Sequence, residues 1–125
     1  MLIHGIDMVE IHRIEEIIKS QQGDRFLKRI CTPDEIKCCE GRIQSMAGRF
    51  AAKEAVMKAL GSGNIGVSWQ DIEITANEDG APVLTLYGGA ETKAKKLGVR
   101  HMAISISHTG EHAIASVIGE CDEDR

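Results

Sequence analysis

Aromatic residues and long apolar runs are scarce in this chain of 125 residues. It has only two Phe, one Tyr and one Trp, so a hydrophobic core must be built from Ile, Val, Leu, Met and Ala. No segment approaches the ~20 apolar residues of a membrane span, and no apolar run follows a basic start at the amino terminus, as a signal peptide requires. We therefore expect a soluble, cytoplasmic protein with a single domain over residues 1–120 and an acidic, disordered tail at 121–125.

Cysteine spacing and net charge argue against two further classes of protein. The four cysteines lack the Cys-x-x-Cys pairs of a zinc site and the dense spacing of a secreted disulfide scaffold, so we expect reduced thiols at Cys31, Cys38, Cys39 and Cys121. The formal net charge of -4 argues against general nucleic-acid binding. Residues 1–60 nevertheless carry ten Lys/Arg against nine Asp/Glu, so this half could meet an acidic partner, although an ordinary solvated surface explains the charge equally well.

The spacing of apolar residues predicts helices in the first half of the chain and hairpins in the second. Helical periodicity covers residues 10–19, 24–30, 33–40 and, in the longest uninterrupted run, Met46 to Gly61. Strand patterns cover residues 2–9, with Asp7 near the end, and flank two turns, Asn77-Glu78-Asp79-Gly80 and Thr109-Gly110-Glu111, with a short helix at 90–97 between the hairpins. This order predicts an α+β fold in which a long helix packs on a mainly antiparallel sheet.

The long predicted helix carries a carboxylate and an ammonium on one face. At 3.6 residues per turn, Glu54 and Lys58 are one turn apart, and they share their side of the helix with Ala47 and Ala51. The two charged groups thus stand over a floor with little side-chain bulk, where a ligand could lie. Taken alone, however, such a pair is most often an exposed i,i+4 ion pair.

Asp7 after a strand and His108 beside a hairpin turn are also ordinary in isolation, but the sequence blocks around these residues are not. The blocks are Gly5-Ile6-Asp7-Met8-Val9-Glu10-Ile11, Gly48-Arg49-Phe50-Ala51-Ala52-Lys53-Glu54-Ala55 followed by Lys58 and Ala59, and Ser105-Ile106-Ser107-His108-Thr109. In this order and over nearly the whole chain, they resemble the holo-acyl-carrier-protein synthase family, the short bacterial-type 4'-phosphopantetheinyl transferases. The resemblance implies that family's fold and the Mg2+-dependent transfer of the phosphopantetheine arm of coenzyme A to a serine of apo acyl carrier protein, which releases adenosine 3',5'-bisphosphate and supports fatty acid biosynthesis.

The resemblance implies a catalytic role for three residues. Asp7 and Glu54 match the family's magnesium-binding carboxylates, and one or two carboxylates together with phosphate oxygens are the ligands that Mg2+ prefers. Lys58 would reach the phosphates and stabilise the charge of the leaving bisphosphate. We expect the serine proton to leave through Glu54 or Asp7 by way of a metal-bound water rather than directly to His108. We also expect the pyrophosphate to lie close to the helix, on its alanine floor.

The resemblance also implies a coenzyme A site. The matching residues are Arg49, Phe50, Lys58, Gly61, Asp79, Gly80, Pro82, His108 and Thr109. His108 and Thr109 match positions near the 3'-phosphate. The family has an Asn-Gly-x-Pro turn against the adenine, and this chain departs from it with Asp79-Gly80-Ala81-Pro82.

A basic surface for the carrier protein is implied by Arg13, Ile17, Arg25 and Arg29, which match the family's contact with the acidic recognition helix of its substrate. A plain solvated face is the alternative. The resemblance further implies a homotrimer with active sites between subunits, and neither a nucleic acid nor a membrane as partner.

Two other functions use the same residues. A non-catalytic nucleotide or coenzyme A binding module would keep the shape without turnover. A Mg2+-dependent pyrophosphate hydrolase would use the same carboxylates with water as the acceptor. Modification of a carrier protein separates both from the transferase.

Overall fold

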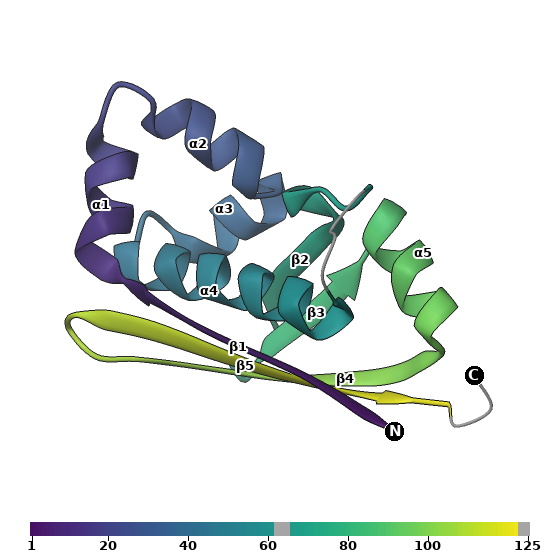
Figure 1. Cartoon of the computed structure of the whole chain (residues 1–125). Helices are drawn as coiled ribbons and strands as arrows, with labels where there is room; N and C mark the ends of the chain where they lie inside the picture. Colours follow the sequence, from purple (N-terminus) through teal and green to yellow (C-terminus); the bar gives the residue numbers. More distant parts are fainter. Residues whose placement is uncertain (62–65, 123–125) are drawn as a thin grey trace.

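A three-stranded sheet and one long helix organise the protein (Figure 1). The computed structural model describes residues 1–61 and 66–122. The elements in chain order are β1 (Leu2–Glu10), α1 (Ile11–Lys19), α2 (Gly23–Ile30), α3 (Pro33–Cys39), α4 (Ile43–Leu60), a 3-10 turn (Trp69–Asp71), β2 (Ile72–Ala76), β3 (Pro82–Leu86), α5 (Gly88–Leu97), β4 (Val99–His108) and β5 (His112–Cys121). The predicted α+β fold with antiparallel strands is confirmed.

The larger sheet has the strand order β1-β5-β4, so the first strand of the chain pairs with the last. Both pairings are antiparallel, and Asp7 of β1 lies opposite Ala115 of β5. β2 and β3 form a separate two-stranded antiparallel sheet. In Figure 1 the helices lie on one side of the larger sheet, with α4 across it. One face of the larger sheet is therefore buried by helices.

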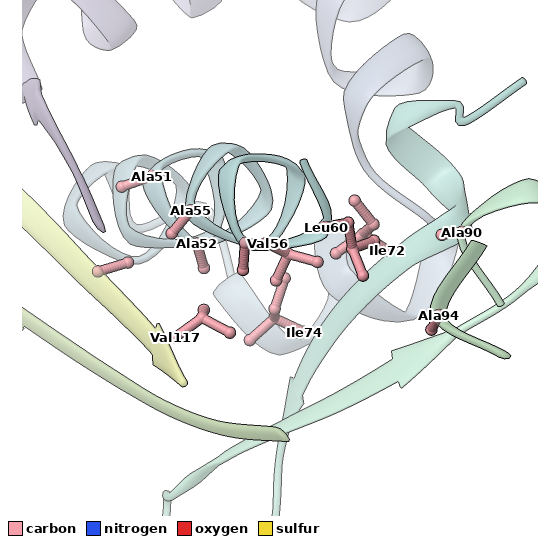
Figure 2. Close-up of a cluster of buried hydrophobic side chains, with 12 residues drawn as sticks. Ala51, Ala52, Ala55, Val56, Leu60, Ile72, Ile74, Ala90, Ala94 and Val117 are labelled. Carbon is pink, nitrogen blue, oxygen red and sulfur yellow. The ribbon is translucent and has the colours of Figure 1, made fainter. Parts of the chain in front are cut away.

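Small side chains bring α4 close to the sheets. Ala51, Ala52 and Ala55 are fully buried on this helix. Figure 2 shows how Val56 of α4 meets Val117 of the larger sheet and Ile74 of the smaller one. Because most of these residues are small or β-branched, the core needs none of the chain's few aromatic residues.

The closest approach of β1 to α4 occurs at Gly5. An ideal Cβ at this position would lie 1.9 Å from the carbonyl oxygen of Ala55 and 2.8 Å from the backbone nitrogen of Ala59. Both atoms belong to the backbone of α4, so they cannot move aside as a flexible side chain would. Glycine at position 5 thus allows the strand to lie directly on the helix.

Three predicted boundaries and surfaces need correction. α4 begins at Ile43, three residues before the predicted start, whereas its end is as predicted, with Gly61 as the C-cap at a φ of 105° that suits glycine. Cys121, assigned to a frayed tail, is buried at the end of β5, whereas residues 123–125 lie outside the described residues. Ala47 is covered by Ile11, Ile14 and Ala113, so the alanine floor is core and cannot hold a pyrophosphate.

A buried ion pair joins α4 to the smaller sheet. Lys53 and Glu35 are both fully buried, with 2.8 Å between Lys53 Nζ and Glu35 Oε1. The ammonium also donates to the carbonyl of Trp69 at 3.0 Å and to that of Ile72. Glu35 Oε2 accepts the backbone N–H of Ile74 at 2.8 Å, and Oε1 accepts that of Thr32 at 2.9 Å. Through these contacts the pair fixes α3 and α4 relative to β2.

All four cysteines of the chain are free thiols. In residues 1–61 and 66–122, no helix is long and apolar enough to cross a bilayer.

Candidate active site

Asp7, Glu54 and Lys58 meet where β1 crosses α4. Gly5 presses the strand onto the helix, and Asp7, two residues further along, points to the same face because side chains of a strand alternate. Lys58 Nζ donates to Asp7 Oδ1 at 2.9 Å and to the carbonyl oxygen of Ile6 at 3.0 Å. Glu54, one turn before Lys58 on α4, lies close enough to Asp7 to interact with it, so two acidic residues that are far apart in the sequence share one location.

The electrostatics of this cluster are set by unequal burial. The side chain of Asp7 is only 11% exposed, whereas that of Lys58 is 56% exposed. Burial raises the pKa of Glu54, and so do the charge of Asp7 and the hydrogen bond that a protonated Glu54 makes with it, while Lys58 lowers that pKa. The hydrogen bond to Asp7 and the charge of Asp7 raise the pKa of Lys58. The carboxylates are therefore held close together and only partly neutralised.

Asp7 Oδ2 is a buried oxygen without a hydrogen-bond partner, the only such side-chain atom in the described part of the chain. A buried acceptor left unsatisfied is costly, so this oxygen calls for a ligand. Within residues 1–61 and 66–122, no three His, Cys, Asp or Glu side chains gather as a metal site. Two carboxylates nonetheless fit Mg2+, which takes its remaining ligands from phosphate oxygens and water.

Arg49 and Phe50, predicted at the coenzyme A site, lie on α4 beside an aromatic row. Phe50 stacks on Trp69 with ring centroids 5.2 Å apart, and the ring centroid of Phe26 lies 6.0 Å from that of Phe50. Arg49 Nε donates to the carbonyl of Ile74 at 3.3 Å, which ties this side chain to β2. Phe50 and Arg49 are both half-buried, so part of each remains accessible to a ligand.

The other predicted coenzyme A residues lie at the end of α4 and in the β2–β3 hairpin. Gly61 ends α4, and its carbonyl accepts a hydrogen bond from Lys93 at 3.4 Å, while the glycine-rich loop after it at 62–65 is outside the described residues. Asp79 and Gly80 belong to the β2–β3 connection and Pro82 begins β3, and Asn77 Oδ1 accepts the backbone N–H groups of Asp79 and Ala81. The predicted hairpin with its turn at Asn77-Glu78-Asp79-Gly80 is thus confirmed, because the backbone N–H of Gly80 also donates to the carbonyl of Asn77 at 3.0 Å.

His108 and Thr109 lie at the β4–β5 turn and are exposed. Asp7 pairs with Ala115, and Ala115 pairs with Ile106, so His108 lies two strands away from Asp7 and two positions further along. Thr109 Oγ1 accepts the backbone N–H groups of Glu111 and His112. Neither residue forms a hydrogen bond or ion pair with the acidic pair of its own chain among the described contacts.

Two of the predicted carrier-protein residues, Arg13 and Ile17, line a hollow beside α1. A cavity of about 350 Å³ is lined by Arg13, Ile17 and Phe50 together with Met8 and other residues of β1, α1 and β5. The side chain of Arg13 is 73% exposed and lies 4.0 Å from the Glu10 carboxylate. Arg25 and Arg29 are exposed on the adjacent helix α2. Arg13 thus gives the hollow one basic side chain, while Arg25 and Arg29 belong to a helix that packs against α1.

Sequence reasoning missed two groups at the site. Trp69 extends the aromatic row through its stacking on Phe50. Its presence as the one tryptophan of an aromatic-poor chain was a signal from which this role could have been predicted. The carbonyl of Ile6 helps to hold the ammonium of Lys58, and backbone groups of this kind leave no signal in a sequence.

Comparisons with known proteins agree on one family. A sequence model described as the 4'-phosphopantetheinyl transferase superfamily matches residues 4–117. Holo-[acyl-carrier-protein] synthase of Herpetosiphon aurantiacus is 44% identical over 126 residues, which cover 95% of this chain and 98% of the relative. That of Koribacter versatilis is 47% identical over 120 residues, covering 93% and 95%. The crystal structure of Helicobacter pylori holo-[acyl-carrier-protein] synthase in complex with coenzyme A is similar with a TM-score of 0.83 and 39% identity, covering 94% of this chain and 99% of that one.

Proposed function

The chain belongs to the 4'-phosphopantetheinyl transferase superfamily, and from this premise we propose that it transfers the 4'-phosphopantetheine arm of coenzyme A to a serine of apo acyl carrier protein. Adenosine 3',5'-bisphosphate is the second product, and fatty acid biosynthesis is the process served. The observation that carries this proposal is the meeting of Asp7, Glu54 and Lys58 at one point of the fold.

Asp7 and Glu54 are the two residues that would hold Mg2+. Their support is the orphaned Asp7 Oδ2 and the closeness of the two carboxylates. When bound, Mg2+ neutralises the charge of the diphosphate of coenzyme A. The protein's own share is to place two acids on rigid elements, one on β1 and one on α4, so that the site needs no rearrangement of the backbone.

Lys58 and Glu54 have different tasks in the transfer. The long, exposed side chain of Lys58 reaches the phosphate oxygens and stabilises the negative charge that grows on the leaving bisphosphate. Glu54 is the carboxylate that Lys58 does not bind, so it is the better placed of the two to accept the proton of the attacking serine. The serine oxygen then attacks the β-phosphorus, and the bond from that phosphorus to the bridging oxygen breaks.

The nucleotide part of coenzyme A contacts Arg49, Phe50 and Gly61 and the two exposed turns, which are Asp79-Gly80-Ala81-Pro82 and His108-Thr109. Within one chain, the His108-Thr109 turn is two strands away from Asp7, which favours a site shared between subunits. A homotrimer supplies that arrangement, with the turns of one subunit facing the acidic pair of the next.

The outer face of the larger sheet is the surface through which the subunits associate. Side chains on this face alternate with the buried ones, and five of them are exposed and apolar: Leu2, Ile6, Met8, Ile114 and Ile118. No helix in residues 1–61 and 66–122 covers this face, as Figure 1 illustrates. A contiguous apolar face on the sheet that carries Asp7 is best explained by contact with further copies of the chain.

The carrier protein binds at the hollow beside α1. Arg13, Arg25 and Arg29 steer the acidic recognition helix, and Ile17 supplies an apolar contact. This surface adjoins β1, so a serine presented there lies near the carboxylates.

The test is incubation of the protein with coenzyme A, Mg2+ and apo acyl carrier protein, followed by intact-mass analysis of the carrier. The expected result is a gain of one phosphopantetheine mass that Asp7→Asn and Glu54→Gln abolish while circular dichroism stays unchanged. Binding of coenzyme A with no mass gain on several carriers would indicate a binding module instead. Release of bisphosphate in the absence of any carrier would indicate a hydrolase.

A further inference from the structure

Lys58 is hydrogen-bonded to Asp7, one of the two carboxylates that the proposed function assigns to a cation. Its ammonium donates to Asp7 Oδ1 at 2.9 Å and also to the carbonyl of Ile6 at 3.0 Å, so it is bound to both a side chain and the backbone of β1. Both contacts are ordinary charge-assisted or backbone hydrogen bonds in length. Lys58 therefore holds Asp7 when neither a cation nor a diphosphate is present.

A divalent cation and this ammonium cannot both keep their best positions. They would share the oxygens of Asp7, with Glu54 one helical turn away on the same face of α4, and two positive groups at such separations repel each other. Asp7 is mostly buried on a strand and cannot move far, whereas Lys58 has a four-carbon stem and is 56% exposed. The lysine is the group that can leave.

We propose that Lys58 acts as an internal counter-ion that competes with the divalent cation for Asp7, and that arrival of the cation frees its ammonium for the diphosphate. The inference rests on the proposed function in one respect, the assignment of Asp7 and Glu54 as cation ligands. It adds an order to the site: the cation displaces Lys58, and the displaced Lys58 then meets the phosphates.

The exchange couples the two ligands. In the free protein, a cation at the unpaired Asp7 Oδ2 is repelled by the ammonium on Oδ1 of the same carboxylate, so the cation alone binds more weakly than the carboxylates would allow. Coenzyme A gives the displaced ammonium a new partner and therefore strengthens binding of the cation, and by linkage the cation strengthens binding of coenzyme A to the same degree. Lys58 thus has opposite effects on the two ligands.

The experiment measures binding of Mn2+ alone by electron paramagnetic resonance, and of Mg2+ alone by calorimetry, with no nucleotide present. The variants are Lys58→Met, which keeps the length of the side chain, and Lys95→Met, which removes the same charge from an exposed pair with Glu91 on α5. Loss of a charge-assisted hydrogen bond to Asp7 predicts that Lys58→Met binds Mn2+ about tenfold more tightly than the unaltered protein. Lys95→Met should bind it as the unaltered protein does, and coenzyme A should bind Lys58→Met more weakly.

Three results would overturn the proposal. Unchanged or weaker Mn2+ binding by Lys58→Met would show that no competition exists. An equal gain in the double variant Asp7→Asn/Lys58→Met would show that Asp7 is not the shared group. Failure of both the unaltered protein and Lys58→Met to bind Mn2+ would remove the cation from the argument. Failure of the transferase is scored separately by the carrier mass assay, and a misfolded Lys58→Met would lose both ligands rather than gain one.

Discussion

Replacement of Lys53 by methionine tests whether the buried ion pair holds α4 in place. The ammonium of Lys53 has three hydrogen-bond partners, Glu35 Oε1 and the carbonyls of Trp69 and Ile72. Methionine fills nearly the same volume and supplies no donor. Glu35 is then left as a fully buried carboxylate that retains only the backbone N–H groups of Thr32 and Ile74.

The expected cost of Lys53→Met is about 3–5 kcal/mol of unfolding free energy, because removal of one partner leaves an uncompensated charge in the core. Small domains are stable by only about 5–15 kcal/mol, so this is a large share of the total. At about 4 °C per kcal/mol for a domain of this size, the melting temperature should fall by about 12–20 °C. Equilibrium urea unfolding followed by circular dichroism gives the free energy directly.

A double-mutant cycle separates the pair from simple loss of packing. Glu35→Gln alone should also destabilise the protein, but Lys53→Met/Glu35→Gln should cost at least about 2 kcal/mol less than the sum of the single variants, because the uncompensated charge is gone. Lys95→Met, in an exposed pair, should cost less than about 0.5 kcal/mol. A loss below about 1 kcal/mol for Lys53→Met, or strictly additive variants, would refute the reasoning.

Four further predictions follow from the contacts at the site and its surfaces. Gly5→Ala should destabilise the protein by about 3 kcal/mol in urea unfolding, since its Cβ would overlap the carbonyl of Ala55; a loss under about 1 kcal/mol would contradict the close contact. The folded state raises the pKa of Glu54, so the native protein binds the proton on this carboxyl more tightly than the unfolded chain does and loses stability as the pH rises through the raised pKa. Glu54→Gln should therefore have a higher melting temperature than the unaltered protein at pH 7 and the same melting temperature below about pH 4. A lower melting temperature of the variant at pH 7 would disprove this. If the proposed homotrimer forms through the outer face of the larger sheet, Ile118→Asp should yield monomers in analytical ultracentrifugation, and an unchanged sedimentation coefficient would remove this face as the interface. Arg25→Glu/Arg29→Glu should raise KM for the carrier protein about tenfold at low salt and much less at roughly 0.5 M salt, where surface charges are screened, and should leave kcat nearly unchanged. Lys96→Glu is the control, and an effect on KM that does not depend on salt would indicate lost packing instead.

Local patterns in the sequence were sufficient to predict most of the helices and strands. Thr32 and Glu35 form a reciprocal capping box at the start of α3, and such a signal depends on residues three positions apart. The second hairpin was equally clear, because its strands are joined by a short turn at Thr109. Boundaries failed where the signal was weak: Arg42 precedes α4 without any side-chain cap, so nothing in the sequence marked the true start of that helix.

Contacts between distant residues were harder to predict. The alanines beside Glu54 looked like an open floor because a helical wheel cannot tell a face covered by a strand from one left for a ligand. Lys53 was a visible anomaly near an apolar side, yet its partner Glu35 lies on another helix and had no marker of its own. The meeting of Asp7 with α4 was expected only through the family resemblance, since Gly5 has the same letter whether it serves a turn or a close packing.

The pairing of β1 with β5 has a consequence for how each molecule is made. Residue 2 pairs with residue 120, and the amino-terminal nitrogen donates to the carbonyl of Cys121 at 3.4 Å. While the ribosome is extending the polypeptide, the strand that bears Asp7 has no hydrogen-bonded neighbour until residues 112–121 have been synthesised. Pairings between such remote segments form slowly. Each new copy therefore gains its reactive centre only after this distant segment has emerged, and clipping β5 would disarm the enzyme at a site more than a hundred positions away in sequence.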